Sequence, residues 1–80
     1  MQGTILKEIK ALIDEYTKNN RKSPTAIYLT LVDENDFLRV PRDEIGDELF
    51  GKITALGPQN AIQQLCGIKV VWNAENRRVE

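Results

Sequence analysis

The residues of this chain that could do chemistry begin with a lone thiol, Cys66, in the stretch LCGIKVVW. A nucleophilic cysteine needs a nearby cation or the start of a helix to hold its thiolate. The sequence places Cys66 at the end of a short helix, where the dipole is negative, and Gly67 suits the left-handed conformation that stops a helix. We therefore expect Cys66-Gly67 to be a helix stop, with Cys66 a small buried hydrophobe.

Histidine is absent from the sequence. Its absence removes the commonest general base near neutral pH, the commonest metal ligand and every triad that contains histidine. The five glycines match neither the P-loop nor the dinucleotide-binding spacing. We predict a protein that is not an enzyme and has no catalytic residues and no cofactor. A small thiol-based enzyme centred on Cys66 stands as the third hypothesis, behind the two binding functions described below.

Acidic residues gather between positions 33 and 48, where they could bind a metal or a basic partner. They are Asp33, Glu34, Asp36, Asp43, Glu44, Asp47 and Glu48. The calcium-loop template fails because Phe37 stands at the fifth position from Asp33 and no glycine follows at the sixth. We predict no metal site. The stretch is typical of a solvated helix face after Pro41, and a docking patch for a cationic partner is the alternative.

Basic residues form two clusters that could hold a phosphate backbone if the fold brought them together. The first is the loop Lys18-Lys22, with Lys18, Arg21 and Lys22, and the second is Arg77 with Arg78. Neither cluster contains an aromatic residue, so there is no stacking platform for single strands. The net charge of −1 supplies no general attraction for nucleic acid. Nucleic-acid binding through these five residues is therefore the alternative function.

The elements that must position these groups start with an amphipathic helix. Its apolar stripe is Ile5, Leu6, Ile9, Leu12, Ile13 and Tyr16. Thr4 is the predicted N-cap, and Asn19 or Asn20 is expected to end the helix in the left-handed conformation. Residues 25–32, TAIYLTLV, read as a strand whose Ile27, Leu29 and Leu31 face the helix.

The second half of the chain predicts one or two more helices and a second strand. Residues 42–56 have helical spacing, interrupted by glycine at 46 and 51, and Pro58 is suited to open a short helix that runs to Cys66. Residues 68–72 read as a strand, followed by a turn over 73–76 and a short strand or frayed tail. We weigh Trp72 as an interface anchor and favour a cap on the core.

These elements predict one α+β domain over residues 1–80. In it, the N-terminal amphipathic helix and one or two further helices pack on one face of a small two- or three-stranded sheet. The other face would carry Tyr28, Val32 and Val71, a modest apolar patch of the kind that marks association. The leading hypothesis is a non-enzymatic interaction or accessory protein that binds a protein partner or self-associates as a homodimer through its sheet.

No apolar run approaches the roughly 20 residues that span a bilayer. The first residues also lack the continuous apolar stretch that a signal peptide contains. We therefore expect a cytoplasmic protein without a membrane partner. The biological process, the partner, the oligomeric state, the strand order and the order of residues 73–80 stay open at this point.

The stretches SPTAIYLTLVDENDFL and LCGIKVVWNAE together resemble small uncharacterised phage- or prophage-associated proteins over about half of the chain. Those proteins share a Pro-Thr pair, an alternating strand, an acidic turn with an aromatic, and leucine-glycine before two valines. This chain differs by the long helical insert over 42–65. The resemblance implies a small accessory or structural protein and assigns no catalytic residue.

Overall fold

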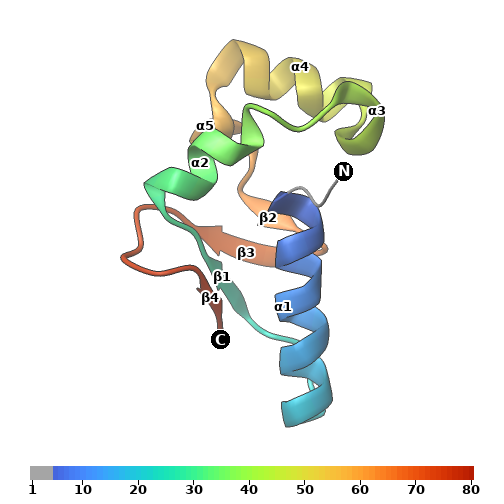
Figure 1. Ribbon diagram of the computed structural model, residues 1–80, viewed down its shortest axis with the longest axis vertical. Coiled ribbons are helices and arrows are strands. Elements are labelled where there is room, and N and C mark those ends of the chain that lie inside the picture. Colours follow the sequence, from blue (N-terminus) through green and yellow to red (C-terminus); the bar gives the residue numbers. More distant parts are fainter. Residues whose placement is uncertain (1–4) are drawn as a thin grey trace.

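The computed structural model describes residues 5–80, which form a mixed sheet with five helices (Figure 1). The predicted α+β class is confirmed. The elements run in the order α1 (Ile5–Asn20), β1 (Ala26–Tyr28), α2 (Leu31–Phe37), α3 (Arg42–Ile45), α4 (Asp47–Leu56), α5 (Pro58–Ala61), β2 (Gln64–Leu65), β3 (Ile68–Val71) and β4 (Arg78–Val79).

Helix α1 forms as its apolar stripe predicts. Ile5 and Ile9 are buried in the core, and Leu6 and Ile13 pack against it. The helix ends one residue later than expected, because Arg21 takes the left-handed conformation at φ 58° and its amide donates to the Thr17 carbonyl. The predicted N-cap, Thr4, lies outside the described residues.

The sheet has the order β2-β3-β1-β4. Strands β1 and β3 are parallel, with Ile27 opposite Val70, and the connection between them contains α2 to α5. Strand β4 runs antiparallel to β1, and β2 antiparallel to β3. The two- or three-stranded expectation becomes four strands in the described residues, because β2 and β4 each add a two-residue edge.

The first predicted strand is wrong in its second half. Strand β1 ends at Tyr28, and Thr30 instead caps α2, accepting from the Asp33 amide at 3.2 Å while its own amide donates to Asp33 Oδ2 at 2.9 Å. This capping box outweighs the β-branched composition of the stretch. As a result Leu31 is 60% exposed rather than in the core, and Val32 is 67% exposed on a helix rather than on the sheet.

The segment LCGI also differs from its prediction. The short helix ends at Ala61, and Leu65 pairs with Ile68 across a two-residue hairpin turn. Cys66 and Gly67 both have positive φ, 54° and 77°, as a type I′ turn requires. Cys66 is therefore exposed at a hairpin tip, so the predictions of a helix stop and a buried thiol are wrong. The turn at Cys66-Gly67 thus replaces the helix that was predicted to run from Pro58 to Cys66.

The core lies on one side of the sheet. Ile27, Leu29, Ile68 and Val70 pack there with residues from the helices. Figure 1 shows α1 running alongside the sheet and α2 to α5 gathered beyond one end of it. Trp72 completes the core as predicted. Its ring meets Phe37 edge to face with centroids 5.9 Å apart, and its indole N–H donates to the Ile62 carbonyl.

Candidate functional site

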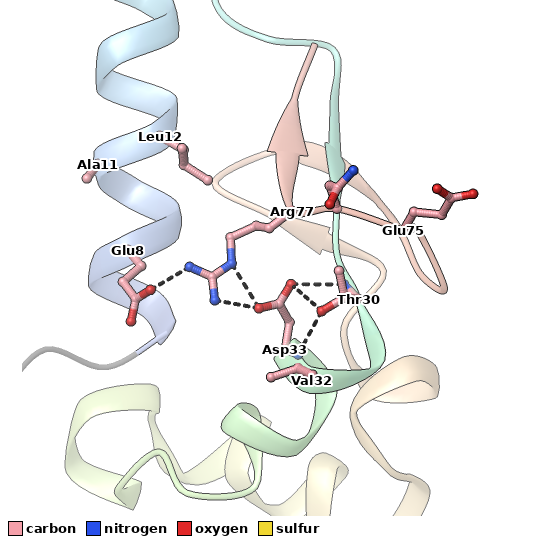
Figure 2. A pocket seen from close by; sticks show the side chains of 9 residues that line it. Glu8, Ala11, Leu12, Thr30, Val32, Asp33, Glu75 and Arg77 are labelled. Atoms are coloured by element: carbon pink, nitrogen blue, oxygen red, sulfur yellow. Dashed lines mark hydrogen bonds and ion pairs between the residues drawn. The ribbon is translucent and has the colours of Figure 1, made fainter.

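Two regions within residues 5–80 could carry function, and the first is a cluster that we call the ion-paired junction: Glu8, Thr30, Asp33 and Arg77. Figure 2 shows the Arg77 guanidinium lying between Glu8 of α1 and Asp33 at the start of α2. Arg77 donates to Asp33 Oδ1 from Nε, at 2.8 Å, and from a terminal nitrogen, and to Glu8 from the other terminal nitrogen. One side chain thus ties together α1, α2 and the segment that enters β4.

Asp33 is the buried member of the ion-paired junction, with a side chain only 2% exposed. Burial by itself raises the pKa of Asp33, but the hydrogen bonds from the Arg77 guanidinium and from the Thr30 amide, together with the Arg77 charge, hold it below its usual value. A carboxylate with a lowered pKa and saturated oxygens is a poor proton acceptor. The geometry of Asp33 is therefore that of a structural anchor.

A hollow of about 560 Å³ adjoins the ion-paired junction. Leu12, Ala11 and Val32 supply its apolar wall, and Glu75, Asn76 and the junction supply its polar wall. The two carboxylates nearest Arg77 are engaged by it. Among residues 5–80, no three histidine, cysteine or acidic side chains are placed to hold a metal ion together.

The second region is the face of the sheet turned away from the core, which we call the open sheet face: Ala26, Tyr28, Lys69, Val71 and Arg78. These residues share a face because side chains alternate along each strand. The register places Tyr28 beside Val71 on one side and Arg78 on the other, and Ala26 beside Lys69. Tyr28, Val71 and Ala26 stay half-buried, while Lys69 and Arg78 are exposed.

Tyr28 is the centre of the open sheet face. The Arg78 guanidinium lies 4.0 Å from the centroid of its ring, within cation–π range. Arg78 also donates to Glu80 at 2.7 Å. A second hollow, about 440 Å³, is lined by Tyr28, Val71 and the chain from Trp72 to Asn76. The face therefore combines an aromatic ring, an aliphatic side chain and a cation around a shallow depression.

The structure divides the residues predicted to bind a partner. Tyr28 and Val71 lie side by side on the open sheet face. Val32 does not join them, because it belongs to α2 and lines the hollow beside the ion-paired junction. Grouping Val32 with the sheet followed from the overlong first strand.

The residues predicted to bind nucleic acid are divided as well. Arg77 and Arg78 are neighbours in an extended segment, so their side chains leave in opposite directions. Arg77 turns inward to Asp33 and Glu8, and Arg78 turns outward over Tyr28. Lys18, Arg21 and Lys22 are exposed around the end of α1, and Lys18 is ten residues beyond Glu8, about 15 Å along the helix axis. Arg77 is therefore not gathered with that loop.

Sequence reasoning missed Asp33 and Glu8 as partners of Arg77, and treated Asp33 as part of a solvated acidic run. One signal was present: Thr30 and Asp33 have the spacing of a capping box. The pairing with Arg77 had no local signal, because 44 residues separate Asp33 from Arg77.

Fold and surface together define a small α+β domain with an ion-paired junction anchored on the buried Asp33 and, separately, a mixed apolar and basic face on the sheet. No family model, curated protein or solved structure matches the chain. The resemblance to phage- or prophage-associated proteins therefore stays a prediction. No helix within residues 5–80 has the length and apolar character needed to cross a membrane.

Proposed function

We propose that this protein is a non-enzymatic interaction module that associates with a second copy of itself through the open sheet face. The observation that carries the proposal is the pairing of Tyr28 with Val71 on the face of the sheet opposite the core formed by residues 5–80. An aromatic and an aliphatic side chain next to each other form an apolar surface, and removing such a surface from water on association is favourable.

The face is a better binding surface than the edges of the sheet. The edge strands, β2 and β4, are two residues long each. Short edges are a device by which proteins prevent further strand pairing. Association by edge pairing would offer few hydrogen bonds, whereas association by the face uses side chains from three strands.

A second copy is the occupant that the charges favour. Lys69 and Arg78 are cations on this face, and Glu75 and Glu80 are acids at its margin. Arg78 is bonded to Glu80 of its own chain, so the cation that would meet an acid of the other copy is Lys69. A surface with both signs can pair with itself in this way about a two-fold axis.

The size of the face sets the expected affinity. The four strands are two to four residues long, and at about 3.3 Å per residue and 4.8 Å between strands they cover roughly 170 Å². A standard stable interface buries about 800 Å² from each partner. The dimer is therefore expected to be weak, with a dissociation constant of about 10 μM or higher.

Sedimentation velocity from about 10 μM to 1 mM tests the proposal with a matched pair of variants. Val71→Asp places a charge on the open sheet face and is expected to leave a monomer at every concentration. Val32→Asp makes the same change at a 67% exposed site on α2 and should associate as the native chain does. Native protein that stays monomeric at 1 mM would exclude the dimer.

Nucleic-acid binding is the second candidate, and one contact favours it. The fold places Tyr28 beneath Arg78 with Lys69 on the same face, so an aromatic ring does lie among cations. Such a surface suits a stacked base of a single strand. It predicts binding of an oligothymidine at about 20 mM salt that weakens steeply as salt rises and is lost in Tyr28→Ser. No binding at that salt removes this candidate.

A further inference from the structure

Strand β4 is attached to the rest of the molecule in the way that a bound peptide is attached to a receptor. It adds to the free edge of β1 in antiparallel register, with Val79 opposite Ile27. The Glu80 amide donates to the Ala26 carbonyl at 3.0 Å, and the amides of Thr25 and Ala26 donate back to the Glu80 carbonyl. An extended segment that lengthens a sheet edge is a recurrent mode of peptide recognition.

Alternate side chains of this segment act as anchors. Arg77 enters the ion-paired junction, and Val79 packs against the core beside α1. Arg78, between them, points outward over Tyr28. Strand β4 pairs with the edge of β1 and contacts α1, and we call the space that it fills the channel between α1 and β1. The surroundings of this space contact the side chains at positions 77 and 79, whereas the side chain at position 78 points away from it.

The chemistry of the first anchor is selective. Asp33 is nearly fully buried and accepts from two nitrogens of the guanidinium, while Glu8, about half exposed, accepts from the third. This forked arrangement fits the planar guanidinium, and a lysine ammonium cannot reproduce it. The second anchor requires an aliphatic side chain, since Val79 meets Ile27 and the core.

We propose that the channel between α1 and β1 is a recognition site for an extended protein segment that carries arginine and, two residues later, an aliphatic residue. In the structure its own Arg77–Glu80 segment fills the site. The partner segment replaces β4 on the edge of β1, places its arginine between Asp33 and Glu8, and releases β4.

The attachment of β4 makes such exchange feasible. Only two of its residues are in strand pairing, and residues 72–77, which join it to β3, contain no helix or strand. Segments with few buried contacts open first in folded proteins. In the native chain β4 competes with a partner segment for the site. The apparent affinity for the partner segment is therefore the intrinsic affinity multiplied by the fraction of molecules in which β4 is released.

Fluorescence anisotropy with a labelled peptide tests the site. The probe is acetyl-Glu-Asn-Arg-Arg-Val-Glu, the sequence of residues 75–80, and its matched control has alanine at the position of Arg77. Both peptides are titrated into the full native chain and into Arg77→Ala, whose own segment lacks the first anchor. We expect Arg77→Ala to bind the probe about tenfold more tightly than the native chain does, and at least about tenfold more tightly than it binds the control peptide.

Equal binding of the two peptides, or no binding of either to Arg77→Ala up to about 2 mM, would overturn the proposal. If Arg77→Ala does not fold, Val79→Ala loosens β4 at the second anchor and is read in the same way. Val71→Asp should leave peptide binding unchanged, because Val71 lies on β3, which pairs with the edge of β1 opposite to the one that β4 occupies. Failure of the dimer and failure of the peptide site are thereby distinguished.

Discussion

The ion-paired junction and the open sheet face contain adjacent arginines that the fold uses in opposite ways. Arg77 is held by a buried carboxylate and joins three elements of the chain, while the exposed Arg78 lies over the half-buried ring of Tyr28. The difference comes from the alternation of side chains along an extended segment. It teaches that a cluster of like charges in sequence does not define a surface until the strand direction is known.

The largest effect should follow from removing the buried acid of the junction. Asp33→Ala leaves the Arg77 guanidinium without its main partner and removes the reciprocal cap of α2. We expect a loss of about 2–4 kcal/mol in the free energy of unfolding, measured with urea. Asp14→Ala, at an exposed position of α1, should change it by less than about 0.5 kcal/mol. A similar small change for Asp33→Ala would mean that the junction does not hold the fold.

The two arginines can be compared directly. Arg77→Ala should lower the free energy of unfolding by about 1–3 kcal/mol, because it leaves a buried carboxylate unpaired. Arg78→Ala removes only exposed contacts and should leave the unfolding midpoint unchanged within error. Equal losses in the two variants would show that the division between an inner and an outer arginine is wrong.

The junction should also respond to pH. The pKa of Asp33 is lower in the folded chain than in the unfolded chain, where it is about 3.9. Its contribution to stability is therefore complete above that value and is lost as pH falls through the folded pKa. Native protein should be more stable than Asp33→Asn at pH 7, and this difference in stability should narrow as the pH falls below about 4. Urea unfolding at each pH measures it, and a constant gap would contradict the ion pair.

The smallest effect concerns the hairpin at one margin of the sheet. Cys66 occupies the first position of a type I′ turn with positive φ, a conformation that asparagine adopts more readily than cysteine does. Cys66→Asn should raise the free energy of unfolding by about 0.5 kcal/mol, whereas Cys66→Ala should not.

In the native chain the exposed thiol should react with a thiol reagent at the rate of a small-molecule thiol. Slow labelling would contradict the turn.

The parts of the fold that could be predicted are those with periodic local signals. The apolar stripe of α1 predicts a helix that covers one face of a sheet. The alternation of side chains along β1 and β3 places Ile27 and Val70 on that face, and it places Tyr28 and Val71 together on the other. Local competition caused the errors at Thr30 and Cys66, where a cap and a turn overrode the composition of their neighbours. The ion pair between Arg77 and Asp33 joins residues that are far apart in the chain. No local pattern in a single sequence indicates such a pairing, so it could not be predicted.

The most direct measurement follows backbone amide chemical shifts of the native chain by NMR as its concentration rises from about 20 μM to 1 mM. The open sheet face as the site of self-association predicts shifts confined to β1, β3 and β4, centred on Tyr28 and Val71. Leu31, Val32 and Leu38 are an exposed apolar alternative on and just after α2. Concentration-dependent shifts centred on those three residues, with the sheet unchanged, would contradict the account.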